Sequence, residues 1–213
     1  MRVSRIEIHP RHADRVFLHT ADGRVLDLAR LAVEEAGLRP GVVIDESQLA
    51  RLRDRDSFER TLGRALHFLE ARPRSEQEVR ARLAREQVSP ELVDRVIDRL
   101  RALGLIDDAA FARFWIENRT RFSPRGARAL KAELRRKGLS EEIVADVDAV
   151  VDEEENIHEV ARRLARRLAK LDRQTFRQRL WGQLARRGFD FDLIGPAVDS
   201  AWQSLLDERS GGA

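Results

Sequence analysis

The chain has 213 residues, 42% hydrophobic and 36% charged, with 40 basic against 37 acidic side chains, so it can bury a core and is not globally disordered. It has no cysteine, which excludes disulfides, thiol nucleophiles and cysteine-bound zinc and favours an intracellular protein. The first residues lack the apolar core of a secretion signal, and no stretch is apolar over the ~18 residues that a membrane span needs, so we expect a cytoplasmic protein.

The first 57 residues begin with the pattern of a small sheet. Apolar residues alternate with polar neighbours in three short segments, at Ile6 and Ile8, at Val16 and Leu18, and from Val25 to Leu28. With a turn at Asp22-Gly23, this pattern predicts an antiparallel meander.

Two short helices should complete this N-terminal part. The first covers residues 29–36 and should end at Gly37. The second, capped by Asp45 or Ser47, should end at about Arg55. We therefore predict a small α+β module over residues 1–57.

From Phe58 onward the apolar residues recur at helical spacing, and helix boundaries follow at short intervals. Ser75 to Glu78 form a capping box, and Pro90 follows Ser89 at a first helical position. Glycines occur where helices should end, at Gly104, Gly138 and Gly188. We predict a mainly helical fold for this part of the chain.

The helical part repeats itself about every 50 residues. Leu83, Leu134 and Leu184 align, with Gln87, Gly138 and Gly188 at the turn that follows. Five further columns are apolar in all three copies: Val79, Leu130 and Leu180; Val88, Leu139 and Phe189; Leu92, Ile143 and Leu193; Val96, Val147 and Ala197; Leu100, Val151 and Ala201. We predict three tandem three-helix bundles, over residues 58–108, 109–155 and 156–208, in an elongated array.

Candidate catalytic and metal sites are weak. The nucleophile-elbow, zincin, P-loop and dinucleotide motifs are all missing from the sequence. His9, His12 and His19 share the predicted sheet without an acidic partner at ligand spacing, and residues 152–155 are acidic where a helix begins, which suits the helix dipole. We expect no enzyme, no metal and no cofactor.

Aromatic residues gather in the second repeat, before the basic residues of that repeat. Phe111, Phe114, Trp115 and Phe122 have a spacing that favours packing in a helical core over stacking on nucleobases. Trp181 and Trp202 in the third repeat are interpreted in the same way.

Basic residues concentrate in two blocks, although the net charge is only +3. Residues 113–137 hold nine basic and two acidic side chains, and residues 162–187 hold ten and one. The candidate binding residues are Arg119, Arg121, Arg125, Arg128, Lys131, Arg135, Arg136 and Lys137, with Arg162, Arg163, Arg166 and Arg167. Guanidinium rows with few acidic partners four residues away indicate a polyanionic partner such as a nucleic-acid backbone; the alternative is a solvated helix face in an arginine-rich chain.

A three-helix unit also allows a helix-turn-helix transcriptional regulator that reads a DNA sequence. The candidate recognition helix over residues 90–103 carries three arginines and three acidic residues, and no Asn, Gln, Ser or Thr to read base edges. Sequence-specific DNA binding is therefore kept as the alternative function.

Three segments of the second repeat resemble the signature of the RecX family, regulators of the bacterial RecA recombinase. They are LIDDAAFARFW at 105–115, SPRG at 123–126 and ELRRKGL at 133–139. Residues 65–83 resemble the first repeat of that family, and the third repeat departs from the pattern at Phe189 to Asp192. The resemblance covers about residues 58–202.

The resemblance implies a cytoplasmic, monomeric, non-enzymatic regulator of DNA repair, recombination and the SOS response. Such a protein binds RecA and its filament on single-stranded DNA, lodges in the filament groove, and inhibits strand exchange, ATP hydrolysis or filament growth. By the same resemblance, the family's basic motif corresponds to Arg125, Arg128, Lys131, Arg135 and Arg136.

Overall fold

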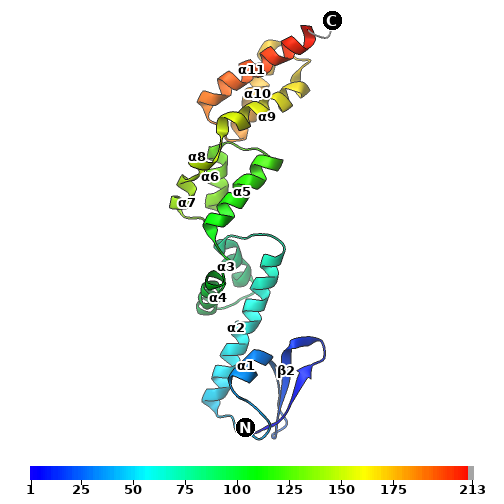
Figure 1. The fold of residues 1–213 in the computed structure, drawn as a ribbon, viewed down its shortest axis with the longest axis vertical. Helices are drawn as coiled ribbons and strands as arrows, with labels where there is room; N and C mark the ends of the chain where they lie inside the picture. Colours follow the sequence, from blue (N-terminus) through cyan, green and yellow to red (C-terminus); the bar gives the residue numbers. More distant parts are fainter. Residues whose placement is uncertain (211–213) are drawn as a thin grey trace. The chain divides into compact units, whose positions relative to one another are not determined.

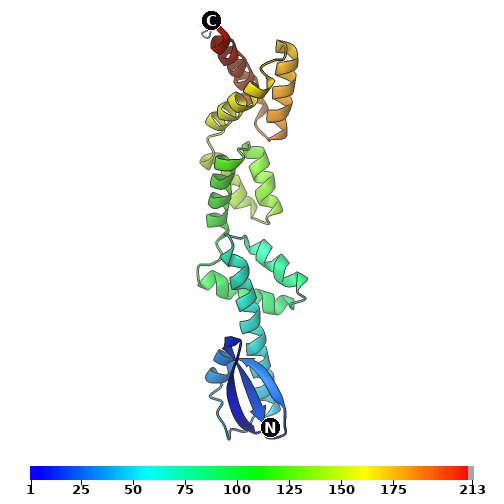
Figure 2. The ribbon, with the colours of Figure 1, turned by 90° about the vertical axis from the view of Figure 1, so that its right-hand side faces the viewer.

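The computed structural model describes residues 1–210, which fall into two compact units. The first unit comprises Met1–Arg72 and Val79–Ile106, and the second comprises Pro73–Glu78 and the chain from Asp107 onward. Figures 1 and 2 show a small sheet with helices in the first unit and helices alone in the second. The predicted mainly helical fold with an α+β start is confirmed.

The N-terminal sheet is the predicted meander. Strands β1 (Val3–His9), β2 (His12–Thr20) and β3 (Val25–Ala29) pair antiparallel in the order β1-β2-β3. Leu18 lies opposite Ile6 on one side and Leu26 on the other, and its side chain is fully buried. Helix α1 (Arg30–Glu35) follows directly and adds Ala32 and Val33 to this core.

The helix expected to end near Arg55 is instead a long helix, so that prediction is wrong. Helix α2 runs through Glu46–Glu70 and begins at Asp45, whose carboxylate accepts the backbone N–H of Gln48 at 2.7 Å. Leu49 and Leu52 on its first half belong to the core of the sheet, whereas Phe58 and Leu62 on its second half belong to the first helical core. Because one helix supplies both cores, the predicted boundary between residues 57 and 58 falls inside α2.

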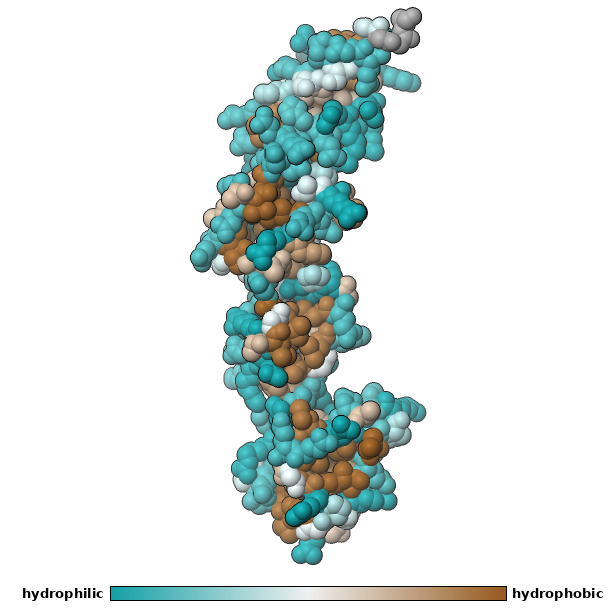
Figure 3. All heavy atoms as spheres, in the orientation of Figure 1, coloured by the Kyte–Doolittle hydropathy of each residue, from teal (hydrophilic) through white to brown (hydrophobic). Residues whose placement is uncertain are grey.

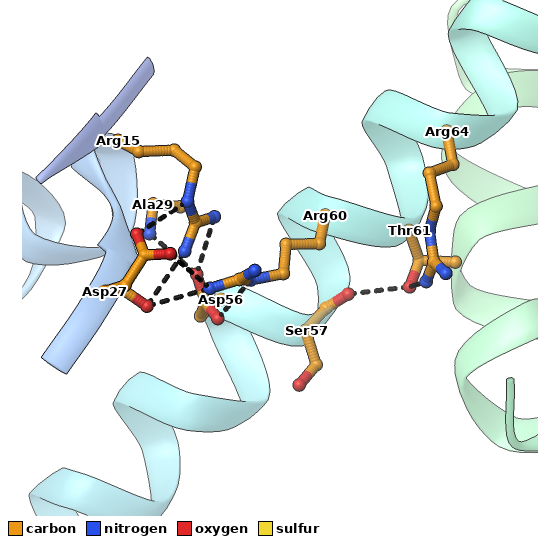
Figure 4. Close-up of polar contacts among 8 residues, drawn as sticks. All are labelled: Arg15, Asp27, Ala29, Asp56, Ser57, Arg60, Thr61 and Arg64. Carbon is orange, nitrogen blue, oxygen red and sulfur yellow. Dashed lines mark hydrogen bonds and ion pairs between the residues drawn. The ribbon is translucent and has the colours of Figure 1, made fainter. Parts of the chain in front are cut away.

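Polar contacts fasten the middle of α2 to the sheet (Figure 4). The nearly buried Asp56 carboxylate accepts the backbone N–H of Ala29 at 2.7 Å, Arg15 at 3.2 Å and Arg60 at 2.8 Å. Arg15 also donates to Asp27 at 2.8 Å. A buried arginine needs such partners, because an unpaired buried charge is costly.

Three helical bundles follow. The first contains the second half of α2, α3 (Glu76–Arg85) and α4 (Pro90–Ala102). The second contains α5 (Asp108–Phe122), α6 (Ala127–Arg136) and a third helix divided at Asp146 into α7 (Glu141–Ala145) and α8 (Val147–Val150). The third contains α9 (Glu153–Leu168), α10 (Arg173–Arg186) and α11 (Phe191–Ser210).

The aligned apolar columns are the cores of these bundles. Leu83, Leu134 and Leu184 all have 0% exposure, and each belongs to a separate buried cluster. The remaining column residues are buried or pack against the same three clusters. The three-repeat prediction is confirmed at the level of individual side chains.

Within the second unit, the start of α3 is held by hydrogen bonds that cap it. Ser75 and Glu78 form the predicted capping box, with the Glu78 N–H donating to Ser75 Oγ at 3.2 Å. Ser75 Oγ also donates to the carbonyl of Lys137 at 2.7 Å, and the Glu76 N–H donates to Asp108 at 2.9 Å.

Contacts of the same kind form a joint between the second and third bundles, both of which belong to the second unit. The Gly126 N–H donates to the carbonyl of Arg187 at 3.0 Å, and the Ala127 N–H donates to Glu153 at 3.2 Å. Gly126 and Ala127 lie 51 residues after Ser75 and Glu76. In both sets of contacts, the acceptors are a carbonyl in the turn before a bundle's third helix and an acidic side chain at the start of the same bundle's first helix.

Candidate nucleic-acid interface

The basic row on α9 forms one exposed face, as predicted. Arg162, Arg163, Arg166 and Arg167 are exposed, whereas Ala161, Leu164, Ala165 and Leu168 between them are buried. Among residues 1–210, no carboxylate pairs with any of these four guanidinium groups. The visible surface of the third bundle is mostly hydrophilic in Figure 3. This row keeps its positive charge available for a polyanion.

In the second bundle, Glu133 lies near two of the candidate cations although it is more than four residues from either in sequence. Its carboxylate, with a side chain 11% exposed, accepts Arg119 at 2.7 Å and the indole N–H of Trp115 at 2.8 Å, and Arg125 lies 4.0 Å away. Glu133 belongs to α6 and Trp115 and Arg119 to α5, so helical spacing alone could not identify these pairs.

Three more of the predicted cations have carboxylate partners. Lys131 pairs with Asp148, Arg135 with both oxygens of Glu141 at 2.8 and 2.9 Å, and Lys137 with Glu78 at 2.7 Å. The hydrogen bond from Arg135 lowers the pKa of Glu141 below its ordinary value. A polyanion would have to compete with these carboxylates for the same cations.

Arg121, Arg128 and Arg136 are the remaining candidate cations of the second bundle, and none of them pairs with a carboxylate of the described chain. Arg121 stacks on Phe122 with its guanidinium carbon 5.2 Å from the ring centre, and Arg128 lies 5.0 Å from the ring centre of Phe191. Arg136 donates to the carbonyl of Ala132 at 3.3 Å. These three cations remain accessible to an anion.

The expectation that the aromatic side chains pack in the helical cores is wrong for Phe122. Phe111 is buried and Trp115 packs against the second core, but Phe122 is 68% exposed. Phe122 is the last residue of α5, and Pro124 soon after it prevents the helix from continuing. Trp181 and Trp202 pack against the third core, as predicted.

Arg187, which was not among the candidate binding residues, belongs to the second basic block but contacts the loop of the first block. Arg187 caps the end of α10 and donates to the carbonyl of Pro124 at 3.4 Å. Burial lowers the pKa of Arg187, and the positive charges of Arg125, Arg163 and Arg167 lower it further. The sequence places Arg187 in the second basic block, but no helical spacing relates it to Arg125.

The histidines and acidic residues considered as metal ligands do not form a site in the described part of the chain. Among the described residues, no three His, Cys, Asp or Glu side chains form a possible metal site. The rings of His9 and His12 are tilted by 44° with 4.8 Å between their centres, whereas His19 contacts Glu7 at 3.0 Å. No helix of residues 1–210 combines the length and apolarity needed to cross a membrane.

The helix proposed for reading DNA bases has four of its six charged side chains in ion pairs within the first unit. Arg95 on α4 forms two hydrogen bonds to Asp54, at 2.7 and 2.9 Å. Arg101 pairs with Asp98 at 3.1 Å, and Asp94 pairs with Arg80 at 2.6 Å. These contacts do not favour α4 as a recognition helix.

Three family models match the three bundles in order. Residues 62–100 match the first three-helix domain of RecX, residues 107–147 the second and residues 152–198 the third. The regulatory protein RecX of Halalkalibacterium halodurans is 31% identical over 213 residues, covering 95% of this chain and 77% of that protein. The chain belongs to the RecX family. A RecX of Mycobacterium sp. strain KMS is 37% identical over 153 residues, covering 68% of this chain and 81% of that protein.

Solved RecX structures share the fold. One crystal structure of a regulatory protein RecX has a TM-score of 0.77 and 22% identity, and covers 93% of this chain and 98% of its own. RecX from Lactobacillus salivarius has a TM-score of 0.62 and 22% identity, and covers 68% of this chain and 97% of its own. The third bundle matches its RecX model despite its unusual turn, in which Phe189 is fully buried and Phe191 is exposed.

Proposed function

We propose that this chain binds the RecA recombinase and its nucleoprotein filament on DNA, and inhibits or modulates ATP hydrolysis, strand exchange and filament growth. The observation that carries this proposal is the match of all three bundles, in order, to the three domains of the RecX family of regulatory proteins. In this proposal the chain is a cytoplasmic monomer that regulates DNA repair, recombination and the SOS response without catalysing a reaction.

The α9 row supports a contact with the DNA backbone. Four guanidinium groups on one exposed face, with no carboxylate partner among residues 1–210, suit phosphate oxygens, which guanidinium binds through paired hydrogen bonds. Arg121, Arg128 and Arg136 of the second bundle extend the proposed contact surface. The paired cations Arg119, Lys131, Arg135 and Lys137 should contribute less, because their carboxylate partners compensate their charge.

The decisive experiment titrates the full chain into RecA filaments on single-stranded DNA while ATP hydrolysis is followed. We expect the wild-type chain to slow hydrolysis. The variant R162Q/R163Q/R166Q/R167Q should need at least about tenfold more protein for the same inhibition, because the charge is lost without loss of core packing. Circular dichroism serves as the folding control.

Two results would contradict the proposal. A wild-type chain that changes neither ATP hydrolysis nor strand exchange over the full titration would exclude RecA regulation. Full inhibition by the folded quadruple variant would remove the α9 row from the contact surface. A large preference for one duplex sequence over random DNA at fixed salt would instead favour the sequence-specific regulator.

A further inference from the structure

A groove with a volume of about 450 Å³ lies within the second unit, lined by α6 and by the turn before α11. Helix α6 contributes Arg128, Lys131 and Arg135, which are three and four residues apart and therefore share one side of the helix. The turn contributes Phe191, the first residue of α11. This turn is where the third repeat departs from the RecX pattern, and the proposed function assigns it no contact.

Close packing fixes the shape of the groove. A Cβ atom at Gly188 would lie 2.4 Å from the Cβ atom of Ala129, so only glycine lets the turn approach α6 this closely. The Glu153 carboxylate connects the helix to the turn, since it accepts the Ala127 N–H at 3.2 Å and the Asp190 N–H at 2.8 Å. The groove is therefore a preformed feature of the fold.

The Phe191 side chain gives the groove an accessible aromatic surface. Phe191 is 53% exposed, whereas Phe189, two positions earlier, is fully buried in the third core. The guanidinium carbon of Arg128 lies 5.0 Å from the centre of the Phe191 ring, and Arg128 also donates to the carbonyl of Ala185 at 3.3 Å. The ring is thus accompanied by an anchored cation, while more than half of the residue stays open to a ligand.

The charges that line the groove balance. Its three basic and three acidic side chains are Arg128, Lys131, Arg135, Asp148, Glu153 and Asp190. Three carboxylates would repel a phosphate group, whereas a nucleobase is uncharged and carries both hydrogen-bond donors and acceptors at its edge. This lining therefore suits a base better than it suits the sugar-phosphate backbone.

The groove lies near the α9 row along the same helix. Glu153 at the groove and Arg162 at the start of the row are separated by about 14 Å along the axis of α9, at 1.5 Å per residue. About four stacked nucleotides of a single strand cover this distance, at roughly 3.4 Å each. A strand whose phosphates bind the row can therefore place a base in the groove.

We propose that the groove binds one nucleobase of a single-stranded nucleic acid, stacked on the ring of Phe191. This site rests on the proposed function and deepens it, because it adds a base contact to the backbone contact of the α9 row. Every base has a flat π face, so stacking on an aromatic ring requires no particular sequence. A single strand offers unstacked bases, which a duplex does not.

The first test measures binding of a labelled single-stranded oligonucleotide to the full chain over a range of salt concentrations. Phe191→Leu keeps an apolar side chain but removes the ring, and should weaken binding about 5- to 100-fold, the effect of one lost base–aromatic stack. The dependence of affinity on salt should stay the same, because no phosphate contact is lost. Phe191→Trp should bind at least as tightly as the wild-type chain, because it restores an aromatic ring.

Phe122→Leu is the matched control for this test. Phe122 is also exposed and also lies beside an arginine, but it ends α5 and does not line the groove. Its replacement should change the affinity by less than about twofold, as for an ordinary surface substitution. Circular dichroism checks the fold of each variant. Equal weakening by Phe191→Leu and Phe122→Leu would overturn the site, as would weakening in Phe191→Trp equal to that in Phe191→Leu.

The second test changes the nucleic acid instead of the protein. A strand of the same length made of abasic sugar-phosphate units keeps the backbone charge and has nothing to stack. The wild-type chain should bind it at least about fivefold more weakly than the ordinary strand, and Phe191→Leu should lose most of this difference. Equal affinity of the wild-type chain for the two strands would overturn the base site.

The outcomes also separate this site from the regulation of RecA. Base-dependent binding that Phe191→Leu loses, with no wild-type effect on RecA, would support the site and overturn the proposed function. Regulation of RecA with no wild-type affinity for the oligonucleotide would do the reverse. Unchanged oligonucleotide affinity in Phe191→Leu, together with weaker inhibition of RecA by that variant, would overturn the base site and favour a protein segment as the occupant of the groove.

Discussion

At the residue scale, one turn position shows how the three repeats have diverged. Before the third helix of each bundle the backbone is left-handed, with φ of 59° at Gln87, 81° at Gly138 and 79° at Gly188. Glycine adopts this region freely, whereas a residue with a Cβ atom is strained in it by about 1–2 kcal/mol. The first bundle therefore keeps a strained residue where the other two have glycine.

Replacing Gln87 with glycine should stabilise the first unit. The Gln87 side chain is exposed, so the change removes strain without loss of packing. The greater freedom of glycine in the unfolded chain offsets part of the gain, and we expect a net increase of about 0.5–1 kcal/mol in the free energy of unfolding. Calorimetry of the full chain measures it. Gln87→Ala is the control, since it keeps the Cβ atom; equal or lower stability of Gln87→Gly would show that the turn is unstrained.

At the element scale, α2 belongs to two apolar cores, and polar contacts hold the part of the helix between them. Its first half packs on the sheet and its second half in the first bundle, with Asp56 between them accepting Arg15, Arg60 and the Ala29 N–H. Two residues before Asp56 on the same helix, Asp54 forms an ion pair with Arg95 on α4.

Asp56→Ala should destabilise the first unit by about 3–5 kcal/mol, because the buried guanidinium of Arg15 loses one of its two carboxylate partners. All three tryptophans, Trp115, Trp181 and Trp202, lie in the second unit. The loss should thus appear in calorimetry or hydrogen exchange, with little change in tryptophan fluorescence. Asp98→Ala, which removes an exposed partner of Arg101, should change stability by less than about 0.5 kcal/mol. Equal effects of both substitutions would contradict this account.

The Asp54–Arg95 pair should make the first unit sensitive to acid. The hydrogen bond from Arg95 lowers the pKa of Asp54 below its ordinary value of 3.8. Since the folded-state pKa is the lower one, this pair stabilises the fold above about pH 4 and loses that contribution as the pH falls through the folded-state pKa. The unfolding temperature of the wild-type chain should fall as the pH is lowered from about 5 to about 2, the range over which carboxylates titrate. In Asp54→Asn this fall should be smaller.

Arg95→Gln provides the matched test of this pH dependence. It removes the donor and should flatten the decline as much as Asp54→Asn does, and the double variant should add nothing further. An unchanged acid response in either single variant would mean that other carboxylates determine the behaviour.

At the scale of the whole molecule, one arrangement of backbone contacts occurs twice within the second unit. Ser75 and Gly126 each donate to the carbonyl that precedes a turn glycine, at Lys137 and at Arg187. The residues next in sequence each donate a backbone N–H to an acidic side chain at the start of the following bundle. The internal repeat therefore includes the connections as well as the bundles.

Gly126→Ala should disrupt the joint between the second and third bundles. The new Cβ atom would overlap the carbonyl of Gly188, so we expect a loss of about 1–3 kcal/mol, measured by tryptophan fluorescence during denaturation. Gly63→Ala is the control, because Gly63 lies in α2 with no atom within 4 Å of an added Cβ, and it should stabilise by about 0.5–1 kcal/mol. A neutral Gly126→Ala variant would show that the joint can relax.

Much of the candidate interface could be predicted from spacing, but its electrostatics could not. The α9 row was identifiable because positions one and four residues apart share a helix face, and the structure leaves it without carboxylate partners. The partners of Lys131 and Lys137, Asp148 and Glu78, are 17 and 59 residues away in the chain. No rule of local spacing relates such residues, so the sequence overestimated the free charge of the second bundle.

The sequence by itself determined the three bundles, their caps and turn glycines, the sheet and the family, because helical and strand periodicity depend on residues only a few positions apart. Only the packed structure shows that α2 continues through Arg55, that Glu133 accepts hydrogen bonds from Trp115 and Arg119, and that the Gly126 N–H donates to the carbonyl of Arg187. These outcomes depend on how separate elements pack. Packing brings together side chains whose distance along the chain carries no information about their distance in space.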